Sequence, residues 1–138
     1  MGRRVITCTL VAVVAAIGCG TGDNVANVSE VRRVRSGVVE LVLLSEHPSI
    51  RPGQDDYVIE FRSADGQLVD VGHVMASASM PMPGMAPMVG SVDITTTDTP
   101  GRYAVASDLS MIGDWRVTLE WSGPVGSGSA IMSLAVQP

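Results

Sequence analysis

The strongest constraint on the fold is a strict alternation of apolar and polar side chains in two stretches of the chain. In residues 114–121 every second side chain is apolar: Trp115, Val117, Leu119 and Trp121. In residues 57–61 the same pattern gives Tyr57, Ile59 and Phe61. A period of two places such residues on one face of a β-strand. The two stretches therefore predict half-buried strands whose apolar faces meet in a core.

The remainder of the chain from residue 37 breaks into short β-rich runs between turn residues such as Arg51-Pro52-Gly53 and Thr99-Pro100-Gly101. The same alternation adds core residues from the first and last runs: Val39, Leu41, Leu43, Met132, Leu134 and Val136. We expect strands over residues 37–44, 57–63, 68–79, 89–97, 102–107, 114–122 and 129–136. About seven short strands at this spacing predict an all-β, immunoglobulin-like antiparallel β-sandwich.

The first nineteen residues are typical of an export signal. Arg3 and Arg4 precede a largely apolar run over residues 5–17, which ends at Gly18-Cys19. That run is shorter than the roughly twenty residues that a membrane-spanning helix needs. Residues 16–19 resemble the bacterial lipobox, in which the cysteine becomes lipid-modified and forms the new N-terminus. We expect Cys19 to be the lipidation site; an ordinary signal peptide, in which Cys19 has no role, is the alternative.

These features divide the chain into a lipoprotein signal peptide (1–19), a flexible tether (20–36) and a β-sandwich domain (37–138). The tether shows no sustained periodicity. Cys8 lies in the segment that export removes, so no disulfide is expected in the domain. The sequence predicts an exported, membrane-anchored lipoprotein in the periplasm or on the cell surface.

The charge balance limits the possible partners. The whole chain carries a net charge of −5, and the part after the signal peptide has seven arginines against fourteen acidic residues. Such an acidic domain is unsuited to nucleic acid or anionic lipid headgroups and better suited to a cation. Apart from the membrane reached through the lipid anchor, the expected partner is a metal-handling or efflux protein.

Five of the eight methionines fall within residues 73–88. Four of them, Met80, Met82, Met85 and Met88, are interspersed with three prolines and a glycine. This composition cannot continue a central strand and must form a loop at one end of the sandwich. Thioethers are soft, uncharged ligands that suit Cu(I). We therefore predict a copper site made by these four methionines, with the imidazole of His73 as a further candidate ligand.

A second interpretation remains open, because methionine is also an adaptable packing residue. The loop can instead plug the sandwich or dock on an apolar groove of a membrane or efflux partner. We expect Met111 and Met132 in the core. The chain has two histidines and no serine-nucleophile or phosphate-loop motif, so we expect no enzymatic activity.

Several segments, in this order, resemble the YtkA-like domain, which is related to FixH-type proteins: Pro52-Gly53, 57–61, 65–69, 80–85, 101–103 and 113–117. The resemblance covers about residues 37–136. It implies an immunoglobulin-like sandwich in an exported or membrane-attached protein, often part of a copper or heavy-metal handling system. The chain departs from the usual methionine string at Pro83-Gly84 and adds Met88. Tyr103 also suits a tyrosine corner, with its hydroxyl bonded to nearby backbone.

Overall fold

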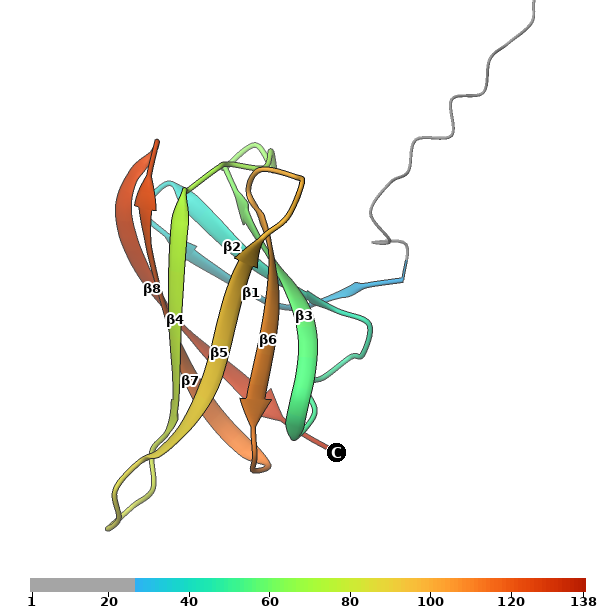
Figure 1. Ribbon diagram of the computed structural model, residues 1–138, viewed down its shortest axis with the longest axis vertical. Coiled ribbons are helices and arrows are strands. Elements are labelled where there is room, and N and C mark those ends of the chain that lie inside the picture. The colour runs from blue at the N-terminus through green and yellow to red at the C-terminus, as the bar shows by residue number, and fades with distance from the viewer. Residues whose placement is uncertain (1–26) are drawn as a thin grey trace, which may run out of the picture.

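A computed structural model describes residues 27–138, so the predicted signal peptide, Cys19 and the first part of the tether fall outside the described residues. Eight antiparallel strands surround one core (Figure 1). They are β1 (Ser29–Ser36), β2 (Val39–Ser45), β3 (Gly53–Arg62), β4 (His73–Met80), β5 (Met88–Thr96), β6 (Arg102–Leu109), β7 (Gly113–Gly123) and β8 (Gly126–Val136). The predicted all-β sandwich is confirmed, with eight strands in place of about seven.

The two layers of the sandwich are joined through β5. The hydrogen-bonded order of the strands is β1-β2-β3-β6-β5-β4-β7-β8. The first residues of β5, Met88 to Gly90, pair with β4, whereas Ser91 to Thr96 pair with β6. A single strand therefore belongs to one layer at its start and to the other layer for the rest of its length.

Gly90 occupies the point at which β5 changes layers. A β-carbon at this position would lie 2.7 Å from Cδ2 of Leu109 and 3.0 Å from Cζ3 of Trp115. The two core side chains occupy the space that a larger residue would need. A glycine inside a strand commonly marks such a close approach.

The predicted core faces are confirmed. All the alternating apolar residues of 57–61 and 114–121 are buried, as are the inward residues expected of the first and last runs. The ring of Phe61 meets Tyr103 and Trp121 edge-on, with centroids 5.4 and 5.3 Å away. Rings in this T-shaped arrangement add to the free energy gained from burial alone.

Tyr103 connects the two layers through its hydroxyl. The hydroxyl donates a hydrogen bond of 2.8 Å to the carbonyl of Gly72, which directly precedes β4. The expected bond from Tyr103 to backbone is therefore present, although its acceptor lies 31 residues upstream and in the other layer.

The largest difference from the sequence-based expectation is β1, because residues 29–36 were expected to belong to the flexible tether. Val31 and Val34 pack against the core. On the other side of the strand, the guanidinium of Arg33 donates to the carboxylates of Glu30 (2.7 Å) and Glu40 (2.8 Å). Because paired arginines cover the outer face of β1, the segment has the composition of a solvated tether although it is a strand.

A smaller correction concerns β4, which begins at His73 and not at residue 68 as expected. The carboxylate of Asp70 accepts a hydrogen bond of 2.9 Å from the N–H of Gly72. Gly72 itself has a φ of 80°, which belongs to a turn and not to a strand. The chain therefore turns at residues 70–72 and only then enters β4.

Candidate metal centre

The methionine loop connects β4 to β5 and projects beyond the sandwich, at the lower left in Figure 1. Met80, the last residue of β4, lies directly opposite Met88, the first residue of β5. Directly opposed residues of antiparallel strands have their β-carbons about 4.5–5.5 Å apart. The base of the loop therefore brings two thioether side chains together.

The tip of the loop brings a second pair together. The N–H of Met85 donates a hydrogen bond of 3.1 Å to the carbonyl of Met82. Pro83 and Gly84 lie between them, and the φ of Gly84 is 75°. These features define a type II turn, which holds its first and fourth Cα atoms within about 7 Å. The β4–β5 register and the turn at Pro83-Gly84 together therefore arrange four methionines as two adjacent pairs.

The four methionines differ in accessibility. Met80 points into the sandwich and is only 9% exposed, whereas Met85 at the tip is 64% exposed. Met82 and Met88 are half-buried. The hydroxyl of Ser110 donates to Sδ of Met88 at 3.6 Å. The pair at the base is thus held by the protein, while the pair at the tip is open to solvent.

A fifth methionine lies in the neighbouring β6–β7 loop. Met111 is 41% exposed, so the expectation that it belongs to the core is wrong, whereas Met132 is buried as expected. The indole N–H of Trp115 donates a hydrogen bond of 2.9 Å to the carbonyl of Met111, which fixes the loop backbone. Antiparallel strands place alternate connections at the same end, so strand order alone could have located Met111 beside the methionine loop.

Residues 80–88 and 109–113 together form one end of the sandwich, which we call the methionine end. Neither segment contains a charged residue. Besides Met85 and Met111, the methionine end exposes Ile112, at 56%. Val89, which directly follows Met88, is 77% exposed. The methionine end is therefore apolar, rich in sulfur and free of charge, in a domain that is otherwise acidic.

The structure does not bring His73 to this end. His73 is the first residue of β4 and Met80 is the last. Seven residues of extended strand separate them by about 23 Å, at roughly 3.3 Å per residue. The imidazole therefore cannot share a metal ion with the loop, and the sequence-based ligand set is reduced to the four methionines.

Comparison with known protein families matches residues 34–120 to the family described as YtkA-like. The chain belongs to the YtkA-like family. The matched region of this YtkA-like domain includes the whole methionine loop. Comparison with curated proteins gives no match. Among solved structures, the crystal structure of the Lin-41 filamin domain is similar, with 17% identity, coverage of 64% of this chain and 81% of that chain, and a TM-score of 0.41.

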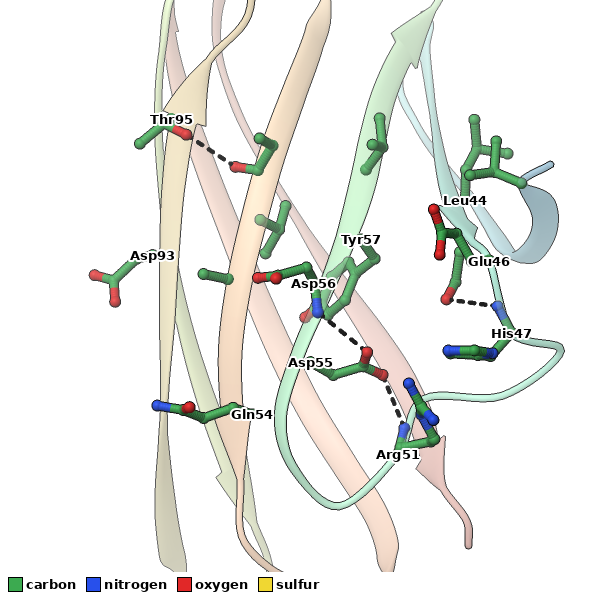
Figure 2. A pocket seen from close by; sticks show the side chains of 16 residues that line it. Leu44, Glu46, His47, Arg51, Gln54, Asp55, Asp56, Tyr57, Asp93 and Thr95 are labelled. Carbon is green, nitrogen blue, oxygen red and sulfur yellow. Dashed lines mark hydrogen bonds between the residues drawn. The ribbon is translucent and has the colours of Figure 1, made fainter. Parts of the chain in front are cut away.

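A hollow of the YtkA-like domain lies elsewhere, beside the β2–β3 loop on the outer face of β3 and β6. It has a volume of about 700 Å³ and is lined by side chains that include Glu46, His47 and Asp93 (Figure 2). Within it, the carboxylate of Asp55 accepts hydrogen bonds from the N–H groups of Arg51 (3.0 Å) and Asp56 (3.1 Å). That carboxylate supports the backbone of the loop, and no methionine lines the hollow.

Within residues 27–138, no group of three or more histidine, cysteine, aspartate or glutamate residues is placed to hold a metal ion. No helix in this part is long and apolar enough to span a membrane. The soft ligand atoms that residues 80–88 offer to a metal ion are the thioether sulfur atoms of four methionines.

Proposed function

We propose that this YtkA-like domain is a non-enzymatic metal-binding module that works outside the cytoplasm and holds copper as Cu(I) at its methionine end. The ligands in this proposal are the sulfur atoms of Met80, Met82, Met85 and Met88. The observation that carries it is the placement of one methionine pair across the β4–β5 ladder and another across a type II turn.

The donor chemistry supports Cu(I) over harder cations. Soft thioether ligands favour Cu(I), whereas Mg²⁺ and Ca²⁺ require oxygen ligands. The methionine loop, residues 80–88, contains no carboxylate to offer to a hard cation. Thioethers also carry no proton, so binding does not require a ligand to be deprotonated. These properties suit an exposed site outside the cell in a domain without a free thiol.

Attachment to a membrane is part of the same proposal. The lipid on Cys19 would hold the domain at a membrane surface, because each buried methylene contributes roughly 0.8 kcal/mol and two or more acyl chains give stable anchoring. A metal-handling or efflux protein in that membrane is the proposed partner. In this arrangement the module would pass copper to, or receive copper from, a neighbour on the same surface.

The test is a Cu(I) titration under a competing chelator, using protein that carries Cys8→Ser and Cys19→Ser so that no thiol competes. We expect saturable, stoichiometric binding. The double variant Met82→Leu, Met85→Leu keeps the apolar bulk and deletes two sulfurs, so its affinity should fall by at least about tenfold, since even indirect contacts to a metal contribute roughly 10–100-fold. Met132→Leu, which removes a buried sulfur from the core, is the matched control and should bind normally.

Two results of the titration would contradict the proposal. One is the absence of saturable Cu(I) binding by the protein. The other is full binding by the variant in which Met80, Met82, Met85 and Met88 are all leucine. Thermal unfolding of each variant shows whether a loss of copper reflects missing ligands or a damaged fold.

A second candidate function rests on the exposed apolar side chains of the methionine end. Exposed Met85, Val89 and Ile112 form a surface suited to docking on an apolar groove of a membrane or efflux partner. A photo-crosslinking residue at position 112 should then capture one membrane protein in cells. The same residue at Val125, which is 49% exposed in the β7–β8 turn at the opposite end, is the matched control and should capture none. Docking should survive in the four-leucine variant, whereas Cu(I) binding should not.

A further inference from the structure

The outer face of β4 and β7 places three side chains with different ligand atoms next to one another. Met75 of β4 lies directly opposite Glu120 of β7, and His73 lies opposite Ser122. Opposed β-carbons are about 4.5–5.5 Å apart, and diagonal neighbours at about 7–8 Å remain within reach of long side chains. His73 and Met75 are two residues apart on one strand and therefore point to the same face. An imidazole, a thioether and a carboxylate consequently share one small surface.

These three side chains are accessible. Met75 is 56% exposed, and His73 and Glu120 are exposed as well. Within residues 27–138, neither the imidazole of His73 nor the carboxylate of Glu120 makes a hydrogen bond or an ion pair with another side chain or with backbone. Three other glutamates on strands, Glu30, Glu40 and Glu60, are by contrast paired with arginines. The potential ligands on β4 and β7 are therefore free to bind a cation.

The surroundings do not oppose a positive ion. The nearest arginine along β7 is Arg116, four residues from Glu120 and thus about 13 Å away along the strand. The position opposite His73 holds a serine, whose hydroxyl is a further oxygen donor. Because β4 and β7 pair continuously from His73 to Ser79, the positions of the three residues are set by the ladder and not by a loop.

We propose that His73, Met75 and Glu120 form a second metal site, which binds Cu(II) on the outer face of β4 and β7. Nitrogen and oxygen ligands suit Cu(II), and Cu(II) is the most tightly bound of the first-row divalent ions at a given site of this kind. Along β4, Met75 and His73 lie about 17 and 23 Å from Met80, by the strand spacing. It goes beyond the function proposed for the methionine end and rests on a separate observation, the register of β4 with β7.

The two sites divide the oxidation states of copper between them. The methionine end offers sulfur alone, and the β4–β7 site offers nitrogen, oxygen and a single sulfur. A domain with both sites would bind copper in either oxidation state, because each oxidation state has its own set of ligands. No electron transfer between the sites is implied, because each binds the ion in the state in which it is supplied.

The experiment is a Cu(II) titration of the Cys8→Ser, Cys19→Ser protein with a competing chelator, combined with electron paramagnetic resonance at one equivalent of copper. We expect one site whose spectrum shows coupling to a single imidazole nitrogen. His73→Ala should abolish that coupling and weaken Cu(II) binding by at least about tenfold, because even the loss of a residue that only supports a metal ligand costs roughly 10–100-fold in affinity. Glu120→Gln should also weaken Cu(II) binding.

His47→Ala is the matched control, because His47 is the other histidine of the chain and lies in the β2–β3 loop. It should leave both the spectrum and the affinity unchanged. Normal Cu(II) binding by His73→Ala, or an equal loss in His47→Ala, would overturn the proposal. His73 and Glu120 are exposed and His47 is half-buried in a loop, so unchanged unfolding midpoints should accompany these results.

The same variants separate this site from the methionine end. His73→Ala should retain full Cu(I) affinity, and the four-leucine variant should retain full Cu(II) affinity. If the four-leucine variant lost Cu(II) and His73→Ala did not, Cu(II) would be bound at the methionine end and the β4–β7 site would be refuted. If Cu(I) binding failed in every protein while Cu(II) binding followed His73, only the proposed function would fail.

Discussion

His73 and Met80 occupy opposite ends of the same strand, and this separation decides which residues can act together. β4 runs from one to the other without interruption. The imidazole therefore belongs to the end of the sandwich at which Tyr103 bonds the carbonyl of Gly72, and the thioethers belong to the methionine end. Any chemistry that needs both His73 and the methionine loop would require a second molecule.

The first prediction uses pH to test this separation. A histidine must be deprotonated to bind a metal and titrates near pH 6.5, whereas a thioether has no proton to lose. Cu(I) affinity at the methionine end should therefore stay constant from pH 7.5 to 5, both in the unsubstituted protein and in His73→Ala. A chelator competition series at several pH values measures it. A marked loss of affinity below about pH 6.5 that disappears in His73→Ala would show that the imidazole does reach the loop.

The second prediction concerns Trp115, which is 1% exposed and packs where β5 changes layers. Trp115→Ala should lower the free energy of unfolding by about 3–5 kcal/mol, because the substitution leaves a large cavity. Domains of this size have only about 5–15 kcal/mol in total. Chemical denaturation measures the change. The neighbouring Arg116→Ala, at an exposed position, is the control and should change the free energy of unfolding by less than about 0.5 kcal/mol.

The third prediction concerns Gly128, which lies opposite Trp121 on the β7–β8 ladder. A β-carbon at residue 128 would come within 2.4 Å of Cζ2 of the indole. Gly128→Ala should therefore displace the ring and destabilise the domain by about 1–3 kcal/mol, the usual cost of overpacking. Ser127→Ala, one residue away and exposed, should be neutral. Equal unfolding midpoints for both variants would mean that the indole does not lie against β8.

The alternation of residues 57–61 and 114–121 was sufficient to predict the core, because a period of two leaves only one way to bury those side chains. The same logic failed for β1. Val31 and Val34 both pack against the core although they are three residues apart, and the register of β1 shifts between Glu30 and Arg32, so the strand shows no regular alternation. The acids that pair with Arg33 include Glu40 on the next strand. Such pairing is a property of the register between two strands, which the sequence of one segment does not contain.

The candidate site was also predictable only in part. Its residue types and the bent loop follow from four methionines interspersed with prolines and a glycine. The pairing of Met80 with Met88 follows from the β4–β5 register, and the turn before β4 determines where His73 lies. Both depend on where a strand begins and ends. Element boundaries are the least reliable part of any prediction from periodicity. The predicted start of β4 was five residues too early, and His73 was wrongly included among the ligands of the methionine loop.

The fourth prediction concerns the proposed anchor. Cys19→Ser removes the acylation site, so the exported protein should appear in the soluble fraction or remain unprocessed. Fractionation of cells followed by mass spectrometry of the N-terminus measures both outcomes. Cys8→Ser is the matched control and should leave the protein with the membranes. Full retention of the Cys19→Ser protein on the membrane would show that the attachment does not depend on acylation.

The last prediction concerns Tyr103, whose hydroxyl bonds the carbonyl of Gly72. Tyr103→Phe should lower the free energy of unfolding at pH 7 by about 0.5–1.5 kcal/mol, the net value of one hydrogen bond. Burial raises the pKa of the Tyr103 hydroxyl above its ordinary value of 10.0. The folded protein therefore holds this proton more tightly than the unfolded chain does, and the resulting stability is fully present below about pH 10 and is lost as the pH rises through that value.

The alkaline part of the denaturation profile also involves Tyr57, because burial raises the pKa of its hydroxyl as well. The Tyr103→Phe protein still has one hydroxyl with a raised pKa, that of Tyr57. The fall in stability between pH 9 and 11 should therefore become shallower without disappearing. Tyr57→Phe should flatten the profile in the same way, and the double variant should flatten it most. Urea denaturation at fixed pH steps measures the slopes. A profile as steep in the double variant as in the unsubstituted protein would mean that the two tyrosines do not control alkaline stability.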